Sequence, residues 1–146
     1  MPRELGRLRG AQAFHVFEKA RSAIAHAILA SKVFEPSDDN IEAIKYDDNS
    51  ILWKFYFDNE EKAKAFMNWM KNTLQTLRNM LGFDRIETKD VKGHEVVIAY
   101  SKELGGKEEF PTAFWVKGNV LYWFESGMDP DALDEILWST LSDKEG

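Results

Sequence analysis

The stretch 112–125 reads TAFWVKGNVLYWFE, two aromatic-rich runs joined by Gly118-Asn119. A Gly-Asn pair between two runs of β-forming residues is typical of a tight β-hairpin. With that turn, one face carries Phe114, Val116, Leu121 and Trp123, and the other carries Trp115, Val120, Tyr122 and Phe124. An antiparallel pair with one solvated side alternates apolar and polar residues, and this pair does not. Something must therefore cover both of its faces.

Three kinds of cover are consistent with this hairpin. An N-terminal helix can lie over the second face, because domains are commonly built of packed layers. That face can instead meet a partner, most simply a second copy of the chain, or line a pocket for an apolar ligand. We expect the two later helices on one side of the sheet, and an alanine-rich N-terminal helix that covers the other side incompletely. The sequence therefore predicts a homodimer or protein-partner interface formed by Phe114, Trp115, Leu121, Tyr122, Trp123 and Phe124.

Two further hairpins are predicted upstream. Residues 42–57 contain two β-rich runs that turn at Asp48-Asn49, and residues 84–100 contain another pair around Lys92-Gly93. In the first of these, the turn places Ile44, Tyr46, Ile51, Trp53 and Phe55 on one face and Lys45, Leu52, Lys54 and Tyr56 on the other. We expect this pair to be buried on the first face and mostly solvated on the second.

Apolar residues at three- and four-residue spacing predict three helices. The first covers residues 5–32, within an N-terminal segment 1–35 that packs across the sheet or on a partner. The second covers residues 59–81, with Asp58 as its N-cap. The third begins at Asp129.

The element order α-ββα-ββββα predicts an α+β fold, a mainly antiparallel sheet of three hairpins with helices packed on it. At 146 residues, the chain is expected to form one domain, residues 1–146. Its predicted core includes Trp53, Phe55, Met70, Leu74 and Leu77.

The composition narrows the class of protein. Charged residues make up 30% and hydrophobic residues 44%, which excludes a disordered chain. The absence of cysteine excludes disulfides and thiolate metal sites. No apolar run reaches the ~18 residues of a membrane-spanning helix. No secretory signal is visible, which together with the absence of cysteine predicts a cytoplasmic location. The dominance of Glu and Lys over only two Gln indicates a thermophilic source.

The charge is unevenly distributed. The net charge of −6 argues against nucleic acid as a general partner. Residues 1–32 nevertheless carry about +4, so the remainder carries about −10. Arginines near the N-terminus are candidates to contact phosphates, although such arginines more often face solvent or form ion pairs. They are Arg3, Arg7, Arg9 and Arg21.

No catalytic motif is present, neither a nucleophile elbow nor a zinc-protease or dinucleotide signature. His15 and His26 lie about 16 Å apart along the predicted helix, too far to share a metal ion. His94 follows a turn glycine and has no visible partner. The acidic triplets 38–40 and 47–49 lack the spacing of a calcium loop and are predicted to form turns. We therefore expect no catalytic residue, no cofactor and no metal site.

The run from Phe114 to Trp123, with the short acidic helix after it, resembles the terminal hairpin-helix of small archaeal domains of unknown function. The resemblance implies an archaeal source and no particular activity. The sequence favours a non-enzymatic binding or assembly module that self-associates or binds a protein partner through the aromatic hairpin. The alternative is a small apolar-ligand-binding protein or an enzyme, with its pocket between sheet and helices and acids such as Glu125 at the rim.

Overall fold

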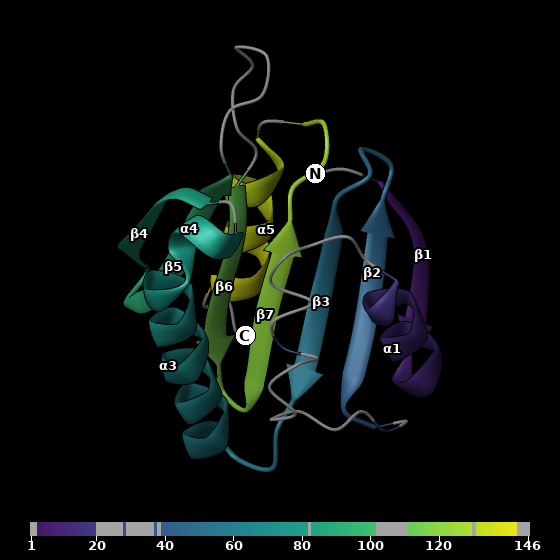
Figure 1. The fold of residues 1–146 in the computed structure, drawn as a ribbon. Helices are drawn as coiled ribbons and strands as arrows, with labels where there is room; N and C mark the ends of the chain where they lie inside the picture. The colour runs from purple at the N-terminus through teal and green to yellow at the C-terminus, as the bar shows by residue number, and fades with distance from the viewer. Residues whose placement is uncertain are drawn as a thin grey trace.

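A computed structural model of the chain describes residues 3–19, 28, 37, 39–81, 83–101, 111–129 and 131–142. One antiparallel sheet holds seven strands in the order β1-β2-β3-β7-β6-β5-β4 (Figure 1). The strands are β1 (Glu4–Arg9), β2 (Ile41–Tyr46), β3 (Ile51–Tyr56), β4 (Phe83–Val91), β5 (His94–Ser101), β6 (Pro111–Lys117) and β7 (Val120–Glu125). The helices among the described residues are α1 (Gly10–Glu18), α3 (Glu60–Thr76), α4 (Arg78–Leu81) and α5 (Ala132–Leu141). The α+β class with a mainly antiparallel sheet is confirmed.

The aromatic hairpin lies at the middle of the sheet, as β6 and β7. Lys117 pairs with Val120 across the turn, which is the predicted register. Gly118 has a φ of 63°, in the left-handed region that this turn requires and glycine tolerates. The predicted division of side chains is also confirmed, because Phe114 and Trp123 belong to the hydrophobic cluster on one face of the sheet and Trp115 and Phe124 to the cluster on the other.

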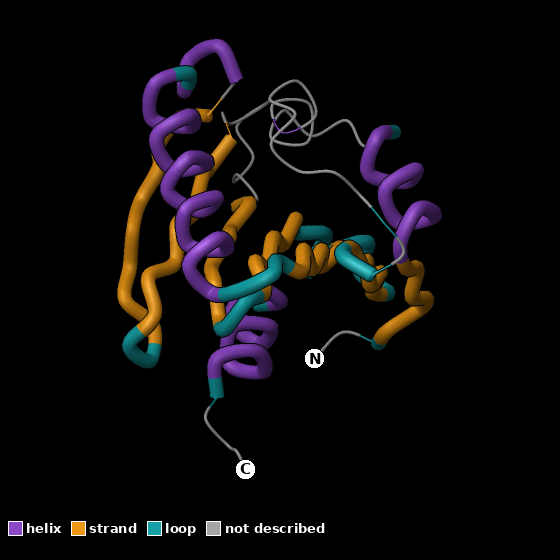
Figure 2. The backbone as a smooth tube through the Cα atoms, turned by 90° about the horizontal axis from the view of Figure 1, so that it is seen from below, coloured by secondary structure: helices purple, strands orange, loops and turns teal. Residues whose placement is uncertain are grey.

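Different helices cover the two faces. On the first face, α1 and α3 pack over Trp53 and Trp123, and the ring of Phe17 lies 5.0 Å and 5.1 Å from theirs. On the second face, α5 packs over Trp115 and Phe124. Figure 2 shows α1 and α3 on one side of the sheet and α5 on the other. The expectation that the two later helices share a side is therefore wrong.

Gly127 lies in the loop between β7 and α5, through which the chain passes to the second face. It passes so close to the β2–β3 turn that a Cβ at this position would collide with the Asp48 carbonyl and the Ser50 amide. The next amide, that of Met128, donates to the Asp48 carbonyl at 2.7 Å. The Asp48 side chain accepts from the Asp129 amide at 3.2 Å. These contacts fix the end of β7 against the turn, where α5 starts.

The N-terminal segment differs from its prediction. Residues 4–9 form strand β1 at the edge of the sheet, and α1 begins only at Gly10, whose φ is 62°. The predicted order α-ββα-ββββα is therefore wrong at its start. The cause is tertiary, because pairing with β2 stabilises a strand that no local pattern marks. The later part of the predicted helix, including Arg21 and His26, lies outside the described residues apart from Ile28, which is buried.

The β2–β3 hairpin is present, but its register differs by one residue from the prediction. Ile44 pairs with Leu52, because the turn is longer and contains Asn49 at a φ of 72°. A shift of one residue moves side chains to the opposite face. Ile44 and Leu52 therefore join the cluster under α5, whereas Trp53 joins the cluster under α1 and α3. Lys54 keeps its predicted place on a partly solvated surface.

Helix α3 also starts and stops inside its predicted limits. Its N-cap is Asn59, whose side chain accepts from the Lys62 amide at 2.9 Å, and not Asp58. Of the predicted core residues, Trp53, Phe55, Met70 and Leu74 are buried, whereas Leu77 at the helix end is half-buried. No described helix is long and apolar enough to cross a membrane.

Removing the side chain of Leu74 tests how α3 is anchored. We expect Leu74→Ala to lower the free energy of unfolding by about 2–5 kcal/mol, because the buried side chain leaves a cavity. Met80→Ala, on the exposed surface of α4, is the control and should change it by less than about 0.5 kcal/mol. Urea denaturation measures both variants. Equal, small effects would contradict the packing of α3 on the sheet.

A methyl group at position 127 tests the contact between the β7–α5 loop and the β2–β3 turn. Gly127→Ala should cost about 1–3 kcal/mol of stability, since backbone on both sides must shift to admit a Cβ. Gly6→Ala provides the matched control, because a Cβ there meets open space. A thermal melt of Gly127→Ala that matches wild type would show that the loop is not packed in this way.

Candidate functional site

Helix α5 covers the second face of the sheet only in part. It packs over Trp115, whose Nε1 donates to Oγ1 of Thr140 at 3.1 Å. Ile44 on β2 and Leu52 on β3 still belong to the apolar cluster of this face, but the side chains around Glu42, from β1 to β7, are polar or charged. We call this surface the basic face and define it as Arg7, Arg9, Lys54, Tyr56 and Tyr122.

Strand register aligns most of these side chains in one row. Arg9 on β1 pairs with Glu42 on β2, Glu42 pairs with Lys54 on β3, and Lys54 pairs with Tyr122 on β7. Facing residues on adjacent antiparallel strands have Cβ atoms about 4.5–5.5 Å apart, so their side chains interact directly. Residues that are distant in the chain thus form one continuous surface.

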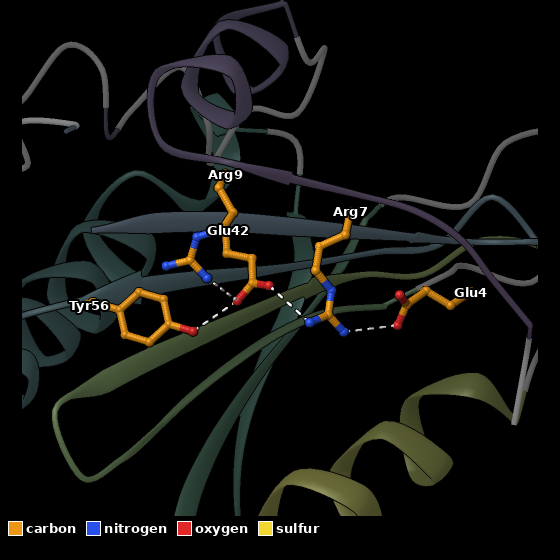
Figure 3. Close-up of polar contacts among 5 residues, drawn as sticks. All are labelled: Glu4, Arg7, Arg9, Glu42 and Tyr56. Carbon is orange, nitrogen blue, oxygen red and sulfur yellow. Dashed lines mark hydrogen bonds and ion pairs between the residues drawn. The ribbon is translucent and has the colours of Figure 1, made fainter. Parts of the chain in front are cut away.

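Glu42 lies beneath this surface and organises it (Figure 3). Its side chain is only 3% exposed. Oε1 accepts a hydrogen bond from the Tyr56 hydroxyl at 2.9 Å and lies 3.7 Å from Nη1 of Arg9. Oε2 lies 3.4 Å from Nη1 of Arg7, and Nη2 of the same guanidinium donates to Oε2 of Glu4 at 3.2 Å. A buried carboxylate is tolerated only with such partners, and here they come from the two neighbouring strands, β1 and β3.

The cations of the basic face keep much of their surface in water. The side chains of Arg7 and Arg9 are 51% and 56% exposed, so several of the five N–H donors on each guanidinium remain available. The guanidinium of Arg9 lies 6.0 Å from the ring centre of Tyr56, and Nζ of Lys54 lies 5.8 Å from that of Tyr122. Cations at such distances are attracted to the ring faces.

The two tyrosines of the basic face keep their protons at neutral pH. Burial, together with the hydrogen bond to Glu42 and its charge, raises the pKa of Tyr56 to about 12. Burial, followed by the Glu42 charge, also raises the pKa of Tyr122. Both phenols therefore keep their protons, and the Tyr56 hydroxyl donates to Glu42. A face with these properties can bind an anion, but its tyrosines are poor bases or nucleophiles.

Five residues of the predicted hairpin interface are fully buried within the single chain, namely Phe114, Trp115, Leu121, Trp123 and Phe124. Their burial removes the surplus apolar surface on which that interface expectation depended. Tyr122 is half-buried and reaches the basic face. Two predicted anion contacts, Arg7 and Arg9, lie there as well. Nothing in the sequence around Glu42 marks it as a site residue, because its partners are assigned only by strand register.

A groove between α3 and strands β5 and β6 is another candidate in the described part of the chain. Its volume is about 370 Å³, and His94 lies in its lining with Lys64 and Glu95. Lys64 pairs with Glu60 at 3.2 Å and Met67 adds apolar surface, so the groove is of mixed polarity. The described residues contain no group of three or more His, Asp or Glu side chains suited to a metal ion.

Comparisons of the chain with protein-family models, with curated proteins and with solved structures found no match. The resemblance of the hairpin to archaeal domains therefore stays an expectation.

The contacts of Glu42 with Arg7, Arg9 and Tyr56 are called the Glu42 network, and Tyr56 offers a test of it. Tyr56→Phe should lower the free energy of unfolding by about 1–3 kcal/mol at pH 7, because the buried carboxylate loses its hydroxyl donor. Tyr122→Phe is the matched control, because the ring stacks on Trp115 without a recorded hydrogen bond from its hydroxyl to any described residue. Chemical denaturation that gives equal stabilities for the two variants would contradict the network.

The same network predicts a loss of stability at alkaline pH. The folded pKa of Tyr56 lies above its unfolded value of about 10, so the tyrosine contributes fully below pH ~10. That contribution is lost as pH rises through the folded pKa of about 12. The melting temperatures of wild type and Tyr56→Phe should therefore converge as the pH is raised from ~10 to ~12. A constant difference across it would show that the phenol does not titrate with folding.

Proposed function

We propose that this protein is a non-enzymatic binding module that holds an acidic segment of a protein partner on the basic face. The observation that supports this proposal is the presence of Arg7, Arg9 and Lys54 beside two tyrosines on the second face of the sheet. With the paired carboxylates of Glu4 and Glu42 counted, these three cations leave a net charge of +1 (three less two) in a chain whose net charge is −6. This local positive charge complements an anionic partner.

The chemistry of these side chains suits carboxylates. A guanidinium matches the two oxygens of a carboxylate and can donate two parallel hydrogen bonds to it. Lys54 adds a cation next to Tyr122, and the two tyrosine rings offer amphipathic contact area. Glu42 restrains Arg7 and Arg9 before any partner arrives, which reduces the side-chain entropy lost on binding.

The small area of the basic face favours an acidic protein segment over nucleic acid as its partner. Nucleic-acid-binding domains generally carry a net positive charge that attracts phosphates over a long stretch. Here the cations occupy one small surface of an acidic chain. The proposal also retains the predicted role of the hairpin through Tyr122, the member of the predicted interface set that is not fully buried.

A fluorescence-anisotropy titration with a labelled, glutamate-rich decapeptide tests the proposal. Wild type should bind saturably, and added salt should weaken the binding. The double variant Arg9→Gln/Lys54→Gln should bind at least about tenfold more weakly, equivalent to ~1.4 kcal/mol. Lys64→Gln, on α3 at the first face of the sheet, is the matched control and should bind like wild type.

The proposal is overturned if the decapeptide does not bind at about millimolar protein, or if both sets of variants lose affinity equally. A second arm uses a single-stranded oligothymidylate of the same charge. Tighter binding of that oligonucleotide, with the same loss in Arg9→Gln/Lys54→Gln, would replace the protein partner by nucleic acid. Weaker binding than that of the peptide supports the proposal as stated.

A further inference from the structure

The two edges of the sheet differ in what they present to solvent (Figure 1). At one edge, β4 carries charges of both signs, among them Arg85 and Glu87, which form an ion pair at 3.3 Å. Charged residues along an edge strand discourage pairing with another chain. At the other edge, all six residues of β1 are exposed. In the described part of the chain, β1 pairs only with β2, so its outer side is unpaired.

Strand β2 uses alternate residues to bond its two neighbours. The Tyr46 amide donates to the carbonyl of Ser50, the residue before β3, at 3.0 Å. Backbone groups alternate in direction along an antiparallel strand. Those of Ala43 and Lys45 therefore point to the opposite side, towards β1.

The same alternation shows which backbone groups of β1 point outward. Gly6 and Leu8 pair with Lys45 and Ala43, so their backbone groups are directed at β2. The amide and carbonyl of Arg7, which lies between them, point away from the sheet. An unpaired edge of this kind can accept an extended segment of another chain, which then adds main-chain hydrogen bonds to the sheet.

The side chains of β1 divide between the two faces. The arginines lie on the second face, because Arg7 pairs with Ile44 and Arg9 pairs with Glu42. Leu8 lies on the first face and is 36% exposed. A strand added to this edge meets cations on one face and an apolar residue on the other.

The row of facing residues that includes Arg9 selects an acidic residue in the added strand. Arg9 faces Glu42, and Glu42 faces Lys54, so charges of opposite sign alternate across three strands. An acid facing Arg9 extends this alternation to a fourth strand, and opposite charges in facing positions stabilise a sheet. A second copy of β1 does not complete the row, because two-fold registers centred on Arg7 or Leu8 place arginine opposite arginine.

From these features we infer that the acidic segment of the partner adds to the sheet as a further strand, antiparallel to β1, with an acidic residue facing Arg9 and an apolar residue facing Leu8. The bulge between Glu4 and Gly6 restricts the regular pairing to Gly6–Arg9. Residues that precede the acid then lie beyond the end of β1, on the side where Tyr56 lies 6.0 Å from Arg9. The added strand rests on the proposed function, because it concerns the same acidic segment.

Backbone methylation of a peptide separates main-chain pairing from attraction between charges. The probe is a labelled hexapeptide that alternates glutamate and valine, and fluorescence anisotropy measures its binding. When its glutamates face the arginines, their amides donate to β1, whereas the valine amides point to solvent. Methylating the internal glutamate nitrogens should weaken binding at least about tenfold, whereas methylating the valine nitrogens should change it less than about twofold.

Two variants at position 7 test the same groups from the side of β1. Arg7→Gln removes the guanidinium and keeps the outward amide, whereas Arg7→Pro removes both. Proline is tolerated on an edge strand where its nitrogen faces solvent, so Arg7→Pro should fold, which circular dichroism checks. The alternating hexapeptide should bind Arg7→Pro at least about threefold more weakly than Arg7→Gln, because one hydrogen bond is lost.

Equal losses from methylating glutamate and valine nitrogens would overturn the added strand, even if Arg7→Pro fails to fold. Equal binding of an isomer with its glutamates before its valines would do the same. If the glutamate-rich decapeptide still binds wild type in these cases, the proposed function stands and only the added strand is wrong. If neither the decapeptide nor the alternating hexapeptide binds at about millimolar protein, both proposals fall.

Discussion

The hairpin β6–β7 is apolar on both faces, and this constraint requires cover on both sides of the sheet. The two covers are unequal. On the first face, α3 has 17 residues and is supported by α1, whereas α5 on the second face has 10. At 1.5 Å per residue these helices measure about 26 Å and about 15 Å, so α5 leaves part of its face open. The strands at that end must therefore present side chains that tolerate water, and the basic face occupies this area.

Glu42 connects the stability of the sheet with the chemistry of its surface. A carboxylate that is 3% exposed needs partners, and these are Arg7 and Arg9 on β1 and Tyr56 on β3. The edge strand β1 is thereby tied to β2, although its own side chains are exposed. The same contacts restrain two guanidiniums whose side chains keep more than half of their surface exposed. One buried charge thus serves both the fold and the proposed binding function.

Features determined by a short stretch of sequence were predicted correctly more often than features that depend on pairing between distant segments. The register of β6–β7 was predicted correctly, because Gly118 marks the turn. That of β2–β3 was wrong, because the run Asp47–Ser50 permits turns of more than one length. Strand β1 and the Glu42 network were missed, since both arise from pairing between distant segments. Arg7 and Arg9 were recognised as candidate anion contacts, but their common carboxylate required the register of β1 on β2.

If the basic face receives the acidic partner, no other surface of the protein should respond to it. Amide NMR spectra of the isotope-labelled protein, titrated with the glutamate-rich decapeptide, measure this residue by residue. The largest saturable shifts are expected at Arg9, Lys54, Tyr56 and Tyr122. Shifts centred on Lys64 and His94 in the groove beside α3, or spread evenly over exposed lysines, would contradict binding at the basic face.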